Sequence, residues 1–177
     1  MADDGYSGVF GAFPYAFRRS DSRLFRSYVL VGGLLAAALA LFFTFAVVVS
    51  IASTLGTGEG TITFVRSIFV FLGLLVVAPV VAPVLFVARR HRRTGSDGRY
   101  DAGLALAGYC FVVATYAGLV ASMPASFELD GEPVTRPEPS GLSAPVVEIL
   151  YGIPELLSWT IPFAAAIGIY VAHRRLG

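Results

Sequence analysis

The chain has almost none of the side chains that build metal centres and redox sites. Of its 177 residues, only Cys110 is a cysteine, and only His91 and His173 are histidines. A single cysteine excludes an internal disulfide, a thiolate metal cluster and a Cys-x-x-Cys redox pair. A closed zinc site would need scattered carboxylates in place of its usual cysteine and histidine ligands. We therefore expect neither a metal nor a cofactor.

Lysine, asparagine and glutamine are missing altogether, and all thirteen basic residues are arginine. This usage is typical of a very GC-rich genome. Over its whole length the composition resembles that of small multi-span membrane proteins of haloarchaea, a group of unknown function. Because no diagnostic motif accompanies it, this resemblance implies a source and no particular activity.

Charged residues are scarce as well. They make up 14% of the chain, while hydrophobic residues make up 56%. Soluble domains have about 25% charged and roughly 45–50% apolar residues. A soluble fold of this length could not bury so much apolar surface. The composition therefore predicts an all-α integral membrane protein whose apolar surface is covered by the lipid bilayer.

Four apolar runs are long enough to cross a bilayer, because a hydrocarbon core of about 30 Å needs roughly 20 helical residues. The first run contains no charge, and its Leu, Val and Phe residues favour insertion by roughly 4 to 8 kcal/mol. The sequence predicts a single membrane domain over 1–177, a four-helix bundle of two antiparallel hairpins. Its spans are expected at 28–54, 64–88, 102–123 and 152–172.

The arginines predict how these spans are oriented. Eleven of the thirteen lie before the first span, between the second and the third, or after the fourth. The opposite side has only Arg66, at the outer edge of the second span, and Arg136, together with most of the acidic residues outside the spans. Because arginine is retained on the cytoplasmic side, we predict a protein of the cell membrane with both termini in the cytoplasm.

Two alternatives to this topology exist. The N-terminal region has features of a cleaved export signal, but its apolar run of about 22 residues exceeds the 7–15 of such signals. The third run is weakened by glycine and alanine and is compatible with a re-entrant segment. Its 22 residues without a charge favour a full crossing.

Two segments outside the predicted spans carry distinctive side chains. In the tail 1–27, aromatic residues precede four arginines, a combination that suits either attachment to an anionic membrane surface or a flank that only sets topology. The acidic loop 124–145 is rich in proline and glycine, which makes regular structure improbable, and a short interfacial helix is expected at 143–151. The arginine-rich connection 89–99 matches no nucleic-acid-binding module, so we expect no nucleic acid partner.

Polar residues at membrane depth are functional candidates because they are costly there. Tyr109 falls near the middle of the third span, so its hydroxyl needs a partner on a neighbouring helix. Glu148 and Glu155 share one helical face. At 1.5 Å per residue they lie about 38 and 27 Å from His173, which places them beyond or at the outer interface. Following Pro154, Glu155 suits the first turn of a helix, where the dipole favours negative charge.

Small residues recur at every fourth position in three spans, a pattern that lets helix backbones approach closely. The repeats are Gly32, Ala36 and Ala40; Ala114, Gly118 and Ser122; and Ala164, Gly168 and Ala172. With the shortage of catalytic groups, they predict a non-enzymatic assembly or accessory subunit that packs against another membrane protein or against its own copies. Prolines in the second and fourth spans leave a small oligomeric transporter or channel as the alternative.

Overall fold

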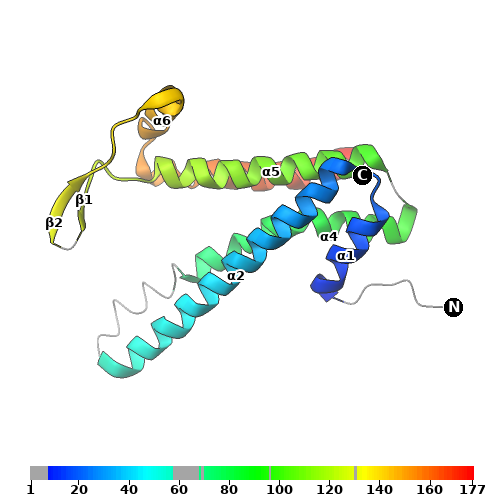
Figure 1. The fold of residues 1–177 in the computed structure, drawn as a ribbon, viewed down its shortest axis with the longest axis horizontal. Helices are drawn as coiled ribbons and strands as arrows, with labels where there is room; N and C mark the ends of the chain where they lie inside the picture. The colour runs from blue at the N-terminus through cyan, green and yellow to red at the C-terminus, as the bar shows by residue number, and fades with distance from the viewer. Residues whose placement is uncertain (1–7, 58–67, 69, 96, 130) are drawn as a thin grey trace. The chain divides into compact units, whose positions relative to one another are not determined.

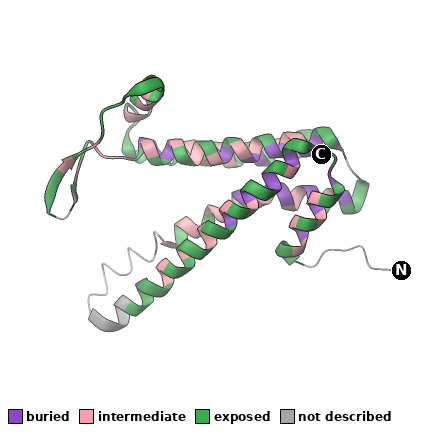
Figure 2. Ribbon diagram, in the orientation of Figure 1, coloured by how far each residue is buried: buried purple, intermediate pink, exposed green. Residues whose placement is uncertain are grey.

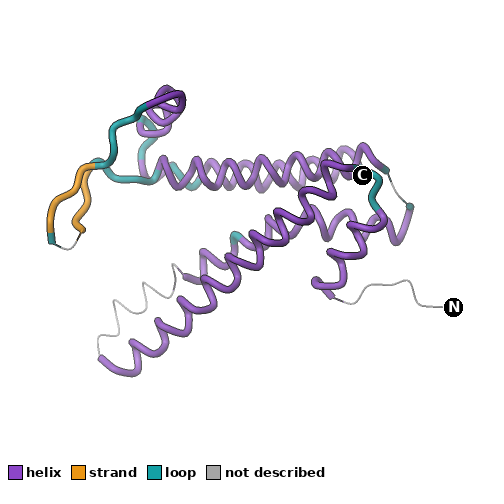
Figure 3. Tube along the Cα trace, in the orientation of Figure 1, coloured by secondary structure: helices purple, strands orange, loops and turns teal. Residues whose placement is uncertain are grey.

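A computed structural model describes residues 8–57, 68, 70–95, 97–129 and 131–177. The protein is mostly helical, as predicted, with one two-stranded hairpin (Figure 3). The elements are α1 (Gly8–Arg19), α2 (Arg23–Thr57), α4 (Val77–Thr94), α5 (Gly98–Ala121), β1 (Ser126–Leu129), β2 (Glu132–Thr135), η1 (Gly141–Ser143), α6 (Ala144–Tyr151), η2 (Glu155–Leu157) and α7 (Thr160–Leu176).

Four helical stretches are long and apolar enough to cross a membrane, as the sequence predicted. They are Arg23–Ala52, Val70–Thr94, Gly98–Ala121 and Glu155–Leu176. The second half of α2 is largely exposed (Figure 2), including the rings of Phe42 and Phe45, as expected of a surface that lipid would cover. The first residues of the predicted span 64–88, through 67, and residue 69 lie outside the described residues.

Internal contacts divide the chain into two compact units, where the sequence had predicted one domain. Unit 1 consists of Met1–Tyr109 and Ile169–Gly177, and unit 2 of Cys110–Gly168. The divisions fall inside α5 and α7, so each of these helices contributes to both units.

In unit 1, α1 packs against α4 and α2 (Figure 1). Ala12 and Ala16, one turn apart on α1, are fully buried. The Phe13 ring lies so close to α2 that a Cβ built at Gly33 would come within 3.1 Å of it. The sequence had predicted this region only as a tail before the first span. Small side chains at i and i+4 give the short helix a flat face on which neighbours can lie.

The Tyr28 side chain joins three helices of unit 1. Its ring is fully buried, and its hydroxyl donates a hydrogen bond of 2.7 Å to the Val80 carbonyl of α4. A Cβ at Gly108 of α5 would come within 2.3 Å of the ring, and one at Gly32 of α2 within 3.2 Å. The two glycines therefore leave the space that this tyrosine occupies.

Two further helix contacts in unit 1 also depend on glycine. A Cβ at Gly73 would lie 2.1 Å from the Phe43 ring, and one at Gly103 would lie 2.3 Å from Cδ1 of Leu176. Both separations are far below van der Waals distance, so any larger residue would displace its neighbour. Neither glycine belongs to the three predicted repeats of small residues at every fourth position.

In unit 2, strands β1 and β2 form an antiparallel hairpin in which Ser126 pairs with Thr135 and Leu129 with Glu132. The prediction that the loop 124–145 lacks regular structure was therefore wrong. The missed signal is the Asp-Gly pair between the strands, a typical two-residue hairpin turn. Gly131 has φ +86°, a value that glycine adopts without strain. Pro133 is tolerated in β2 because both strands of a two-stranded sheet are edge strands.

A helix, α6, is present at Ala144–Tyr151, where the sequence predicted one over 143–151, and its place at a membrane surface stays a prediction. Beyond it, Glu155 opens the short helix η2 directly after Pro154, consistent with the predicted helical first turn. Pro162 lies in the first turn of α7, where the missing N–H costs no helical hydrogen bond. Close packing in this unit occurs at Gly118, where a Cβ would lie 2.9 Å from Cδ of Pro162.

Replacing Gly118 with alanine should destabilise unit 2. The added methyl group would also come within 3.2 Å of the Ser158 carbonyl, and overpacking of this kind costs about 1–3 kcal/mol. We expect Gly118→Ala to lower the melting temperature of the purified protein in detergent. Gly168→Ala is the matched control, because no described atom lies within 4 Å of a Cβ there. Equal melting temperatures for the two variants would contradict the described contact.

Candidate functional site: a basic pocket beside a buried carboxylate

The carboxylate of Asp101, in the first turn of α5, is fully buried in unit 1. The Ser20 hydroxyl donates to its Oδ2 across 2.5 Å, and His91 Nε2 lies 3.0 Å from its Oδ1. Burying a carboxylate is costly unless it is hydrogen-bonded and paired. Both oxygens of Asp101 have such a partner. We call Ser20, His91 and Asp101 the buried polar cluster.

The corner between α1 and α2 holds Ser20 in place. Its hydroxyl accepts a hydrogen bond from the Ser22 backbone N–H at 3.2 Å, and its carbonyl accepts one from Arg26 Nε at 2.8 Å. The Ser22 hydroxyl in turn accepts from the backbone N–H of Phe25 at 3.2 Å, which caps the start of α2. The serines before the first span therefore set the direction in which the chain enters α2.

The connection from α4 to α5 positions the other two members of the cluster. α4 is followed by Gly95 with φ +89°, which a residue with a Cβ rarely adopts. Asp97 Oδ1 then accepts hydrogen bonds from the backbone N–H groups of Arg99 at 3.0 Å and Tyr100 at 3.4 Å. This cap starts α5 and places Asp101 one turn later, beside the last turn of α4.

The order in which the three side chains of the cluster contact one another decides its chemistry. A nucleophilic serine needs a base at its hydroxyl, usually a histidine oriented by a carboxylate. Here the carboxylate of Asp101 lies between the other two groups. The Ser20 hydroxyl therefore donates its hydrogen bond to a carboxylate that also contacts His91. This arrangement joins segments of the chain and differs from a triad, in which the serine contacts the histidine. His91 Nδ1 is buried and has no hydrogen-bond partner among the described residues.

The buried polar cluster is not predicted by the sequence reasoning above, which considers the two histidines only as metal ligands and does not include Asp101. A usable signal existed in the burial pattern expected for α5. Asp101 lies three residues before Leu104 and four before Ala105, both fully buried, so it falls on the apolar face of that helix.

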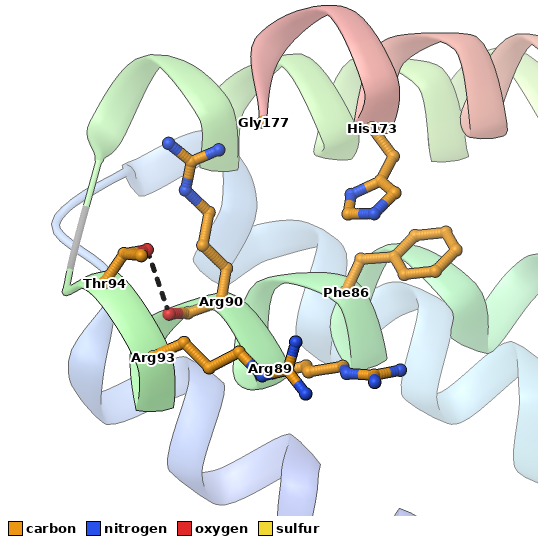
Figure 4. A pocket seen from close by; sticks show the side chains of 7 residues that line it. All are labelled: Phe86, Arg89, Arg90, Arg93, Thr94, His173 and Gly177. Atoms are coloured by element: carbon orange, nitrogen blue, oxygen red, sulfur yellow. Dashed lines mark hydrogen bonds between the residues drawn. The ribbon is translucent and has the colours of Figure 1, made fainter.

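A pocket of about 440 Å³ lies in unit 1 on the basic end of α4, beside the end of α7. Its lining residues are Phe86, Arg89, Arg90, Arg93, Thr94, His173 and Gly177 (Figure 4). Figure 4 shows the Arg89 and Arg93 side chains extending in the same direction, while Arg90 turns toward Gly177. We call this hollow the basic pocket.

Arg90 is engaged by the protein, whereas Arg89 and Arg93 are not. Arg90 donates to the Leu176 carbonyl at 3.0 Å, lies 3.6 Å from Asp97 Oδ2 and stacks 4.2 Å above the centre of the Tyr100 ring. Arg89 and Arg93 are exposed, and neither makes a hydrogen bond or an ion pair within the described part of the chain.

The apolar side of the basic pocket is an aromatic stack. The His173 ring lies parallel to the Phe86 ring, with 4.2 Å between centroids and 6° between planes. His173 Nδ1 lies 2.6 Å from the Tyr100 hydroxyl. The stack connects α4, α5 and α7 and gives the pocket a flat hydrophobic wall beside the Arg89 and Arg93 side chains.

The residues predicted as polar candidates lie in three separate places. The Tyr109 hydroxyl has a partner on a neighbouring helix, the Ser27 hydroxyl of α2 at 3.0 Å. This contact joins the middle of α5 to the start of α2. Glu155 is exposed on η2, and Glu148 is exposed on α6. Glu148 lines a second hollow of about 570 Å³ with Arg136 and Tyr151.

The three repeats of small residues have different surroundings. Gly32 and Ala36 are buried, but the nearest atoms to a Cβ at Gly32 belong to Tyr28 of the same helix. In the second repeat Gly118 is at a close contact, while Ser122 is exposed. Along the third repeat Ala164 and Gly168 are exposed and Ala172 is half-buried. The remaining members, Ala40 and Ala114, are half-buried.

Within the described residues there is no group of three or more His, Cys, Asp or Glu side chains that could hold a metal ion. The buried polar cluster has one carboxylate and one imidazole, both already engaged with each other. The basic pocket instead offers guanidinium donors, which suit oxygen anions.

Removing the buried carboxylate should strongly destabilise unit 1. In Asp101→Ala, Ser20 and His91 lose their shared acceptor and stay buried. Breaking a buried pair in this way costs about 3–5 kcal/mol. We expect a large fall in the melting temperature in detergent. Asp21→Ala removes an exposed carboxylate from the same corner of the chain and should change stability by less than about 0.5 kcal/mol.

A double-mutant cycle gives a second measurement of this network. Ser20→Ala should cost much less in an Asp101→Ala background than in the wild-type chain, since its acceptor is already gone. Strict additivity of the two substitutions would show that the Ser20–Asp101 hydrogen bond contributes nothing to stability.

Comparison with known proteins places the chain in a family. No curated protein and no solved structure matches it. A domain family of unknown function, DUF8056, matches over residues 1–177. The match covers the whole described structure, including the buried polar cluster and the basic pocket. The chain belongs to the DUF8056 family.

Proposed function

We propose that this DUF8056 chain is a non-catalytic, multi-pass protein of the cell membrane that acts as an assembly or accessory subunit. It would pack a membrane-spanning helix against a helix of another membrane protein. The observation that carries this proposal is the exposed small-residue surface of α7, formed by Ala164 and Gly168. No described atom lies within 4 Å of a Cβ at Gly168.

The surroundings of Gly168 support such a role. Phe163 and Ile167 flank the small residues on α7 and are also exposed. In a bilayer, burial of apolar surface does not by itself drive helices together, and close backbone contact at small residues does. A helix face with large apolar groups beside a glycine is therefore suited to receive the ridge of a second helix.

The polar groups of unit 1 support a role without catalysis. The Ser20 hydroxyl and His91 Nε2 both contact Asp101, and the Tyr28 hydroxyl donates to a backbone carbonyl. Each of these bonds joins two parts of the chain. A catalytic group would need to reach a substrate, whereas the carboxylate of Asp101 is fully buried.

Gly168→Leu tests the proposed contact. Since the position has open space within the chain, the substitution should leave the melting temperature of the isolated protein nearly unchanged. It should weaken association, because a leucine would hold the two helix backbones apart. The measurement is the mass of the complex purified in mild detergent from its native membrane, with Ile167→Leu as the volume-conserving control.

Three outcomes of this measurement are informative. A complex with a second protein that is lost in Gly168→Leu but kept in Ile167→Leu supports the proposal. A homo-oligomer of defined size with ion or solute flux in vesicles would favour a transporter or channel instead. A strict monomer without partners, in the wild type and in both variants, would count against both functions.

The topology that accompanies this function, with both termini in the cytoplasm, predicts which positions face outward. In a Cys110→Ala background, a cysteine at Ser140 should react with an impermeant thiol reagent added to intact cells, while one at Thr94 should not. Both native residues are exposed in the structure, so burial does not distinguish them. Labelling of Thr94→Cys from outside would overturn the orientation.

A further inference from the structure

The basic pocket has a combination of features that the proposed assembly role does not use. Two arginines, Arg89 and Arg93, lie four residues apart on the surface of α4 and extend in the same direction (Figure 4). Like charges at this spacing repel each other. In the part of the chain that the structure describes, Asp97 is the one carboxylate within ion-pair distance of a pocket arginine, and it pairs with Arg90.

Among the described residues neither the Arg89 nor the Arg93 guanidinium group has a hydrogen-bond or ion-pair partner, so both are available to bind an anion. Each offers five N–H donors in a planar arrangement that matches the oxygens of a phosphate group. Arg90 does not compete for this anion, because the Leu176 carbonyl, Asp97 and the Tyr100 ring already occupy its guanidinium.

The other wall of the pocket indicates that the anion carries an apolar part. Phe86 and His173 stack at 4.2 Å and line the hollow on the side facing the apolar length of α4. A volume of about 440 Å³ is within the range of small-molecule sites and is suited to a headgroup rather than to a whole lipid. Arg89 directly follows the apolar run of α4, at the depth where headgroups would lie.

We propose that the basic pocket binds the phosphate headgroup of an anionic phospholipid, with Arg89 and Arg93 holding the phosphate and the Phe86–His173 stack contacting the glycerol and the first acyl carbons. A soluble phosphate compound shares the first of these interactions but not the second. Basic hollows between membrane helices bind lipid headgroups in this manner.

The test uses the full-length protein in detergent and native mass spectrometry, with phosphatidylglycerol as the anionic probe and phosphatidylcholine as the zwitterionic one. The wild type should bind phosphatidylglycerol more tightly than phosphatidylcholine. The double variant Arg89→Gln/Arg93→Gln should bind phosphatidylglycerol about 30-fold more weakly, since each arginine near an anionic headgroup contributes roughly a factor of five.

The matched control is Arg174→Gln/Arg175→Gln, which removes the same charge from exposed residues outside the pocket. It should change the affinity by no more than a few-fold. Equal weakening in both double variants would reduce the effect to overall charge and overturn the site. Unchanged binding in the pocket variant would overturn it directly.

A third arm distinguishes the source of the phosphate. Millimolar glycerol 3-phosphate should not displace the bound phosphatidylglycerol, because it lacks the apolar part that contacts the aromatic stack. Displacement at this concentration would assign the pocket to a soluble phosphate. Equal binding of the two lipids would overturn the preference for an anionic headgroup and with it the proposal. Phe86→Ala gives an independent readout: it should weaken phosphatidylglycerol binding while leaving both arginines in place.

Discussion

The buried carboxylate of Asp101 is the constraint on which the arrangement of unit 1 depends. It can remain buried only while the Ser20 hydroxyl and His91 Nε2 both reach it. These partners come from the corner before α2 and from the last turn of α4, so one carboxylate fixes three segments that are far apart in sequence. The N-terminal helix α1 lies against α4 as a consequence, because the corner that follows it is tied to α5.

The helix α4 carries this constraint on one face and the basic pocket on another. His91 points inward in line with the buried residues Val84 and Val87, whereas Arg89 and Arg93 are exposed on the surface. Side chains on one helix have fixed positions relative to one another. The contact between His91 and Asp101 therefore also sets where the Arg89 and Arg93 guanidinium groups lie. The last turn of α4 favours the positive charges of these arginines, because it is the negative end of the helix dipole.

Hydropathy alone predicted the four long apolar helices, because length and lack of charge are local properties of the sequence. It could not predict α1, because its 12 residues are too few for a membrane span and include Pro14, and its helical form depends on packing through Ala12 and Ala16. The hairpin was missed for another reason: proline-rich composition was given more weight than the Asp-Gly turn signal. Helical periodicity could have placed Asp101 on the apolar face of α5, but it could not identify the partner: Ser20 and Asp101 are 81 positions apart, and only the packed helices bring them together.

The fit of the Tyr28 ring into the space left by Gly108 has an evolutionary consequence. The two positions share one volume, which a ring on α2 fills because α5 has no side chain there. A family member that gained a methyl group at position 108 would have to lose ring volume at position 28 to keep the same helix spacing. Substitutions at these two positions should therefore occur together across the family, and a chain that changed only one of them would have to move a whole helix.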